Sequence, residues 1–240
     1  MSWSEDGWPT INYGKPISLI TIAAGLYVYN QPTKWSEIFG ASQLQLGWYR
    51  KNTPTKPEAA YSLKDRKGHL RIFGGPYKLS SPASPTALFR KQLHRQGIWR
   101  ARLSFIPETS DCEAGTVVYW NYLTWSSIGI RHGTSGVRQV VVTPVEGDAS
   151  FSDLTTSDAD VVLTIECQNL KYRFGFEELT KRAKGGSSEK GVQWVSESSV
   201  ESLTRPPPVG NPFTGMMLGL YAFDLHGGRT PADFAFAEFM

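Results

Sequence analysis

The chain has 240 residues, of which 40% are hydrophobic and 20% are charged, and its formal net charge is +3. This length and balance suit a globular protein with one large domain or two small ones. Its Lys and Arg residues are scattered rather than clustered, which argues against a nucleic-acid partner, and no apolar run approaches the roughly 20 residues that span a bilayer, which argues against a membrane partner.

Short segments rich in β-branched and aromatic residues recur along the chain, separated by Gly, Pro, Asn or Ser. We expect strands at residues 19–29, 68–73, 87–92, 99–107, 115–121, 126–133, 138–145, 160–169, 170–177, 192–199 and 215–223. Helical signals are weak, and short helices are expected only within residues 32–44 and 176–186. Many short strands with such turns between them are typical of an antiparallel sandwich or barrel, so the sequence predicts an all-β fold.

The first residues, MSWSEDGW, have neither the basic region nor the apolar region of a secretory signal, so a cytoplasmic location is expected. Cys112 and Cys167 fit no metal-binding spacing and no disulfide framework. Without a secretory signal, two unpaired thiols are expected rather than a bridge between them.

Three long motifs resemble parts of one known module: SLKDRKGHLRIFGGPYKLSSPASPTALFRKQ (62–92), EAGTVVYWNYLTWSSIGIR (113–131) and FTGMMLGLYAFDLHGGRTPADFAFAEF (213–239). This module is the C-terminal sandwich of family-43 glycoside hydrolases, the β-xylosidase group. The opening WSEDGWPTINYGKPISL (3–19) resembles the segment in which the catalytic propeller of those enzymes runs into the linker. The resemblance implies a concanavalin-like jelly-roll sandwich of two antiparallel sheets at residues 30–240, preceded by a linker remnant at residues 1–29.

The resemblance also implies a function. In this family the module packs against the propeller and has been classed as a xylan-binding module, so xylan or a xylo-oligosaccharide is the expected ligand. The carboxylates that glycoside hydrolysis requires belong to the propeller. No catalytic residue can therefore be carried over to this sequence, and no glycosidase activity is expected from this chain alone.

A sugar-binding site needs flat aromatic rings that stack on the sugar and polar side chains that bind its hydroxyls. Strand alternation predicts that Tyr119 and Asn121 point to one face of their strand, and Trp120 and Tyr122 to the other. Alternation also places Arg90 and Gln92 on a common face of another strand. For each aromatic residue, a place in the core is the competing interpretation. The candidate ligand-binding residues are Trp48, Arg90, Gln92, Trp120, Asn121, Tyr122 and Trp125.

Two groups of acidic residues could in principle carry chemistry. Asp111 and Glu113, in TSDCEAG, are expected to be surface-loop acids rather than a catalytic pair. Asp148, Asp224 and Asp233 are candidate ligands for a structural calcium ion, because carboxylates hold calcium in some jelly-rolls of this kind. No regularly spaced acidic run supports such a site, so neither a metal nor another cofactor is expected.

Two other functions stay open. The chain could be a stand-alone cyclase or isomerase of a small molecule that reuses the concave face as an aromatic-lined pocket with His132 or Arg90 inside. A closed pocket would support that function, whereas an open groove would support sugar binding. Alternatively, the chain could be a structural fragment whose exposed face meets a propeller domain or a second copy of the chain.

Overall fold

The computed structural model describes residues 2–11, 14–15, 33–52, 59–133, 136–179, 191–205 and 215–240. The chain divides into two compact units, residues 1–32 and 33–240. In the first unit, β1 (Ser2–Trp3) pairs antiparallel with β2 (Pro9–Thr10). The strand expected at residues 19–29 and the domain boundary expected between residues 29 and 30 lie outside the described residues, so both stay predictions.

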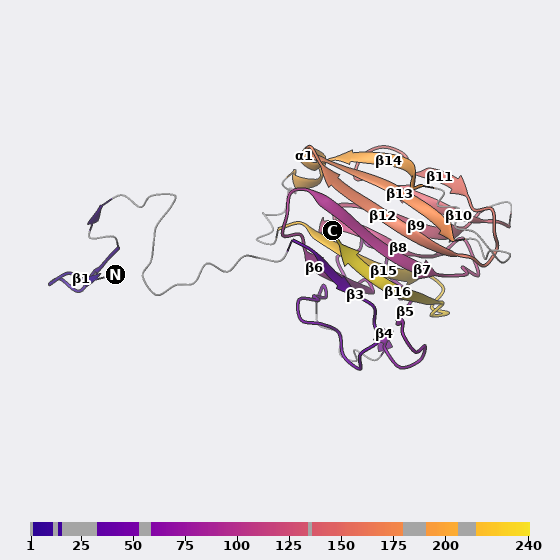
Figure 1. Ribbon diagram of the computed structural model, residues 1–240, viewed down its shortest axis with the longest axis horizontal. Helices are drawn as coiled ribbons and strands as arrows, with labels where there is room; N and C mark the ends of the chain where they lie inside the picture. Colours follow the sequence, from indigo (N-terminus) through magenta and orange to yellow (C-terminus); the bar gives the residue numbers. More distant parts are fainter. Residues whose placement is uncertain are drawn as a thin grey trace. The chain divides into compact units, whose positions relative to one another are not determined.

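The second unit contains two antiparallel sheets, which run as two layers in Figure 1. The six-stranded sheet has the order β11 (Ser150–Asp153), β10 (Arg138–Thr143), β9 (Thr124–His132), β8 (Cys112–Asn121), β15 (Met217–Asp224) and β6 (Ala87–Lys91). The eight-stranded sheet has the order β14 (Gln193–Ser199), β13 (Lys171–Leu179), β12 (Asp160–Gln168), β7 (Gly97–Ser104), β16 (Pro231–Phe239), β5 (Leu70–Phe73) and β4 (Tyr61–Ser62), with β3 (Trp35–Glu37) also paired to β16. The all-β jelly-roll class predicted from the sequence is confirmed.

A large apolar core fills the space between the two sheets. Val118, Ile128 and Val140 enter it from the six-stranded sheet, and Leu163 and Phe234 enter it from the other sheet. Because side chains alternate along a strand, every second residue of the central strands faces this core. Burial of apolar surface on this scale is the main favourable contribution to the stability of such a domain.

The ten strands expected within the described residues, from 68–73 to 215–223, all overlap strands of the two sheets. Four strands of the sandwich escaped the sequence analysis. β3 and β4 are only three and two residues long, and β11, with sequence SFSD, has no apolar alternation. β16 begins with a proline, which a strand tolerates at its first residue.

Both expected helices require correction. The range 32–44 contains β3 instead, because Trp35–Glu37 pairs with Phe239, Glu238 and Ala237 at the C-terminal end of the chain. Residues 176–179 of the second range belong to β13, and residues 180–186 lie outside the described residues.

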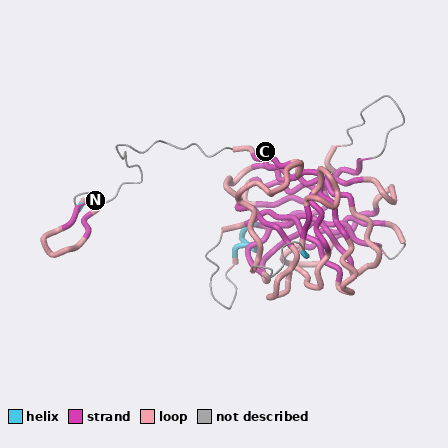
Figure 2. Tube along the Cα trace, turned by 90° about the horizontal axis from the view of Figure 1, so that it is seen from below, coloured by secondary structure: helices cyan, strands magenta, loops and turns pink. Residues whose placement is uncertain are grey.

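The described part of the chain has one helix, α1 (Val200–Thr204), which the sequence analysis did not predict (Figure 2). Its N-cap is Ser199, whose Oγ accepts a hydrogen bond from the backbone N–H of Glu201 at 3.1 Å. The helix has five residues, so no described helix could cross a membrane.

Candidate functional site

A second apolar cluster lies on the face of the six-stranded sheet that points away from the core, which we call the far face. It contains Phe89, Val117, Tyr119 and Tyr221, which alternate with core residues along their strands. Tyr119 packs against Phe89 with ring centroids 4.8 Å apart, and Trp125, its cross-strand partner, packs half-buried against the cluster. Tyr119 is therefore a core-like residue, and Trp125 is only partly available to a ligand.

The other predicted residues of this region form the β8–β9 hairpin. The strand register shifts between Tyr119 and Asn121, so the simple alternation predicted for residues 119–122 fails there. The Oδ1 atom of Asn121 accepts the N–H of Leu123 at 2.8 Å, and its amide nitrogen donates to Thr124, so this side chain shapes the turn. Tyr122 lies in the turn with the ammonium of Lys51 5.2 Å from its ring centroid, and Trp120 is half-buried.

Trp48 and Arg90 come together beside β6, the last strand of the six-stranded sheet. The Arg90 guanidinium lies 3.8 Å from the centroid of Trp35 and 5.5 Å from that of Trp48, and it donates to the carbonyl of Leu46. The indole N–H of Trp48 donates to Glu37 at 2.6 Å. The polar atoms of both residues therefore bind other parts of the domain.

Gln92 lies in a third region, apart from the hairpin and from the Trp48–Arg90 pair. Its Oε1 accepts the hydroxyl of Tyr172 at 2.7 Å, and its Nε2 donates to the carbonyl of His94 at 2.9 Å. Tyr172 belongs to the eight-stranded sheet, as does the Trp35 that meets Arg90, so Arg90 and Gln92 both contact the opposite sheet. The seven predicted residues thus fall into three separate groups.

Glu113 is not the surface-loop acid that the sequence predicted. It lies on β8, is only 2% exposed, and accepts the hydroxyl of Tyr221 at 2.5 Å and the Nε of Arg131 at 2.9 Å. Burial, together with the Glu113 charge and hydrogen bond, raises the pKa of Tyr221 well above its usual value. This buried network of Glu113, Tyr221 and Arg131 links neighbouring strands on the far face. The Glu113 carboxylate is too buried to meet a substrate.

Two of the three candidate calcium ligands, Asp224 and Asp233, bind other residues, and the third, Asp148, is exposed. Asp224 accepts hydrogen bonds from Thr230 and from the N–H of His226, and Asp233 pairs with Arg66 and Arg71. Within the described ranges, no three His, Cys, Asp or Glu side chains are grouped as metal ligands would be. The chemistry of this donor set therefore gives no support for calcium.

Both cysteines are buried free thiols, and burial raises the pKa of Cys167 to about 12. A thiol with such a pKa stays protonated at neutral pH and is a poor nucleophile.

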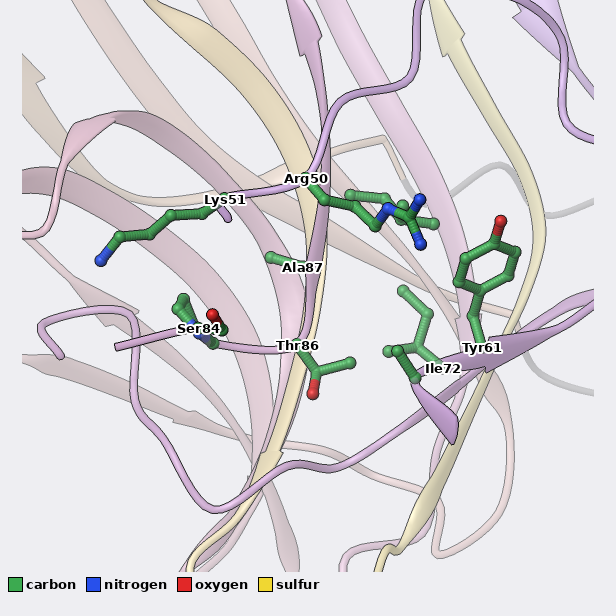
Figure 3. Close-up of a pocket in the computed structure, with 10 residues that line it drawn as sticks. Arg50, Lys51, Tyr61, Ile72, Ser84, Thr86 and Ala87 are labelled. Atoms are coloured by element: carbon green, nitrogen blue, oxygen red, sulfur yellow. The ribbon is translucent and has the colours of Figure 1, made fainter. Parts of the chain in front are cut away.

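Three hollows in the described part of the chain are candidate ligand sites. The first, of about 60 Å³, lies between residues 50–51 and 84–88 (Figure 3). In it the Arg50 side chain extends toward the ring of Tyr61, with its guanidinium carbon 6.0 Å from the ring centroid, while Lys51 extends away from them. This volume holds a few water molecules and no sugar ring.

The second hollow is open and has a volume of about 550 Å³. We call it the Tyr61–Phe73 hollow, and its lining residues are Tyr61, Ser62, Lys64, Asp65, Phe73 and Arg229. Both rings are half-buried, and the Arg229 guanidinium lies 4.6 Å from the centroid of Phe73. Two aromatic rings beside four polar side chains make the combination that sugar binding requires. The sequence analysis missed it, although Tyr61 and Phe73 bracket the polar stretch SLKDRKG.

The third hollow, which we call the Arg95 pocket, has a volume of about 480 Å³. Its lining comes from the segment after β6, the β12–β13 turn, the first residue of α1, and Met216 just before β15. Gln92 is the one predicted site residue in it. A volume of this size is typical of small-molecule sites.

Comparison with known proteins agrees with the fold described above. The model of the β-xylosidase C-terminal concanavalin A-like domain, from the family-43 glycoside hydrolases, matches residues 36–240. A non-reducing end α-L-arabinofuranosidase of Bacteroides ovatus is 25% identical over 249 residues, and a xylan 1,3-β-xylosidase of a Vibrio species is 26% identical over 254 residues. These alignments cover 100% and 99% of this chain but 43% of each relative.

Solved structures show the same relation. A Bacteroides ovatus family-43 protein of a xyloglucan utilisation locus superposes with a TM-score of 0.79 at 23% identity, covering 100% of this chain and 45% of that one. A xylan β-1,4-xylosidase of Bacillus halodurans gives a TM-score of 0.76 at 24% identity, covering 99% of this chain and 45% of that one. The chain thus spans less than half the length of these proteins, and at this identity the likeness establishes the fold.

Proposed function

Because the chain belongs to the family of β-xylosidase C-terminal concanavalin A-like domains, we propose that it is a non-catalytic domain that binds xylan or xylo-oligosaccharides. The observation that carries the proposal is the Tyr61–Phe73 hollow, which is open and combines two aromatic rings with four polar side chains. An open hollow admits an inner segment of a long chain, whereas a closed pocket admits only a small molecule or a chain end.

The proposed contacts follow from the chemistry of a pyranose. Its C–H faces stack on a ring such as Tyr61, while Lys64 and the second carboxylate oxygen of Asp65 exchange hydrogen bonds with its hydroxyls. Ser62 holds Asp65 in place, because its hydroxyl donates to Asp65 Oδ1 at 2.8 Å and accepts the N–H groups of Lys64 and Asp65. Each hydrogen bond to sugar replaces one to water, so its net gain is small and the affinity should be modest. Such a domain works best beside a catalytic domain that it holds near the substrate, and we propose a propeller for that role.

The β8–β9 hairpin is the competing location for the same function. Trp120, Tyr122 and Trp125 are half-buried there, so part of each ring is open to a ligand. The hairpin nevertheless lacks a free amide, because Asn121 binds Leu123 and Thr124. We therefore place the sugar in the Tyr61–Phe73 hollow and treat the hairpin as the alternative that the experiment must separate.

The small-molecule cyclase or isomerase receives less support. Neither Arg90 nor His132 lines any of the three hollows described above. Arg90 is instead engaged with Trp35 and Leu46. No described cavity therefore combines an aromatic lining with either of these groups.

Isothermal titration with xylohexaose, with cellohexaose as the control sugar, tests the proposal. We expect saturable heat with xylohexaose, and Tyr61→Ala should weaken the affinity about tenfold, which corresponds to about 1.4 kcal/mol. Tyr77→Ala removes the same side chain from an exposed position outside the hollow and should leave the affinity unchanged.

Each other outcome has a definite meaning. Loss of binding in Trp120→Ala or Trp125→Ala, but not in Tyr61→Ala, would move the site to the hairpin. Equal affinities for xylohexaose and cellohexaose would contradict a preference for xylan. Absence of heat with either sugar would overturn the proposed function.

A further inference from the structure

The Arg95 pocket lies where strand ends of both sheets meet. Gln92 and Leu93 follow β6 of the six-stranded sheet, while Asn169 and Leu170 form the turn between β12 and β13 of the eight-stranded sheet. The carbonyl of Leu170 accepts the N–H of Val200 at 2.9 Å, which ties this turn to α1. Secondary-structure elements of both layers therefore hold the walls in place.

The charge of the lining has a single sign. Arg95, Lys171 and His94 contribute basic groups, and none of the lining residues is Asp or Glu. Lys171 is paired with Glu197 at 2.5 Å, so its charge is already balanced. Arg95 is exposed, and within the described ranges its guanidinium has neither a hydrogen bond nor an ion pair. One unbalanced cation thus faces a hollow that contains no competing carboxylate.

The remaining lining suits a sugar ring. Leu93 and Leu170 are 58% and 78% exposed, so the rim presents apolar surface of the kind that packs on the C–H face of a pyranose. The side-chain amides of Gln96 and Asn169 have no partner in the described part of the chain and can bind hydroxyls. The floor contains Cys167 and Tyr172, both buried.

The turn at the rim is held in a costly backbone conformation. Asn169 has φ +52° and Leu170 has φ +61°. Asparagine adopts this left-handed conformation readily, but for leucine it is energetically unfavourable. Glycine would be the favoured residue at the second position of such a turn. An exposed leucine in a place that suits glycine has no structural benefit visible in the turn itself. Such strain is a recognised mark of functional positions.

We propose that the Arg95 pocket binds a sugar that carries a carboxylate, that is, a uronic acid. Arg95 pairs with the carboxylate, Leu170 and Leu93 pack on the ring, and Gln96 and Asn169 bind hydroxyls. A guanidinium forms two parallel hydrogen bonds with a carboxylate, which a neutral sugar cannot offer. That the ligand is a sugar rests on the proposed function, whereas the preference for an acid rests on the lining charge alone.

Titration of the full chain with sodium glucuronate, followed by backbone amide NMR, tests this inference, with glucose as the neutral control. We expect glucuronate to shift the amides of residues 92–96 and 167–172, and glucose to shift them at least tenfold less at equal concentration. The glucuronate affinity should fall as salt is raised, because the pairing partners are exposed charges.

Three variants separate binding from folding. Arg95→Gln should weaken glucuronate binding about tenfold without changing the melting temperature, because the side chain is exposed and forms no hydrogen bond or ion pair with the described residues. Lys67→Gln removes an exposed positive charge away from the pocket and should change neither quantity. Leu170→Gly should raise the melting temperature by about 2–4 °C through relief of the positive φ, while it weakens binding.

The following results would overturn the inference: no pocket shifts with glucuronate, equal shifts with both monosaccharides, or unchanged binding in Arg95→Gln. A higher melting temperature in Leu170→Gly with unchanged glucuronate affinity would contradict the proposed packing of Leu170 on the sugar ring. Failure of xylohexaose to bind the Tyr61–Phe73 hollow is a separate result, since neither monosaccharide titration depends on it.

Discussion

Asp233 shows how a buried carboxylate stabilises this domain. Its two oxygens accept hydrogen bonds from Arg71, its cross-strand partner, at 2.7 and 2.8 Å, and Arg66 adds a third at 3.0 Å. Burial raises the pKa of Asp233, but the two guanidinium groups outweigh it and hold the pKa below its usual value. A carboxyl group whose folded pKa is lowered stabilises the fold above its unfolded pKa of about 3.9, and this stabilisation is lost as pH falls through the folded pKa.

We therefore expect Asp233→Asn to lower the free energy of unfolding at pH 7 by about 1–3 kcal/mol, because two partly exposed guanidinium groups lose their buried, charged acceptor. Below about pH 4 the difference between variant and wild type should shrink, since the carboxyl group is protonated first in the unfolded state and then, as pH falls through the lowered folded pKa, in the folded state. Denaturant unfolding at pH 7 and at pH 3 measures both values. Glu146→Gln breaks an ion pair with Arg205 in which both side chains are more than half exposed, and should change stability little at either pH. An equal loss in both variants would contradict the role given to Asp233.

The β8–β9 hairpin shows how a local structural need competes with a binding role for the same residue. From the sequence, Asn121 is a donor for a sugar, but in the structure its side chain bonds to Leu123 and Thr124 across the turn. Asparagine side chains commonly shape turns in this way. A register shift in β8 accompanies the turn and changes the direction of the aromatic residues around it.

Asn121→Ala should lower the free energy of unfolding by about 1 kcal/mol, because the N–H of Leu123 loses its acceptor. It should leave the xylohexaose affinity unchanged, since the proposed sugar site is the Tyr61–Phe73 hollow. Asn121→Asp keeps the acceptor oxygen and should recover most of the stability. Thermal melts and titrations on the three proteins measure both effects. A loss of sugar affinity with full stability would return Asn121 to the binding site.

On the scale of the whole molecule, the sandwich has a core of its own. Each described member of the apolar core, from Phe39 to Phe239, lies within residues 33–240. The first strand of the sandwich, β3, begins at Trp35. The sandwich unit has more than 200 residues, a size at which a single core supplies enough stability without disulfides or metals.

A protein that begins at Thr33 should therefore fold and unfold cooperatively, with a melting temperature within about 2 °C of that of the full chain. Removal of residues 33–48 as well should be strongly destabilising, because it deletes β3 and the Trp35 and Trp48 rings that pack against Trp99. Circular dichroism melts compare the three proteins. A large loss of stability on removing residues 1–32 alone would show that the sandwich is not self-sufficient.

Much of the fold could be predicted from short stretches of sequence. In GHLRIF and DVVLTIECQN, local alternation and β-branched residues are sufficient to predict a strand, because the direction of neighbouring side chains depends only on the backbone of that strand. The turn residues between such stretches favour antiparallel connections, and these two signals were sufficient for the all-β class. Trp35–Glu37 was misassigned because its strand state depends on a partner about 200 residues away.

The candidate site was far less accessible to such reasoning. Local pattern correctly identified an aromatic-rich chain and the common orientation of Arg90 and Gln92, but it could not tell which rings pack on one another and which stay open. Tyr61, Phe73 and Arg229 meet in one hollow only because β4 and β5 pair and the loop before β16 returns to them. Arg95 and Leu170 likewise share a pocket because strand ends of two different sheets converge. Local sequence determines the periodicity of each strand, whereas a binding surface is made of residues whose proximity arises from long-range packing.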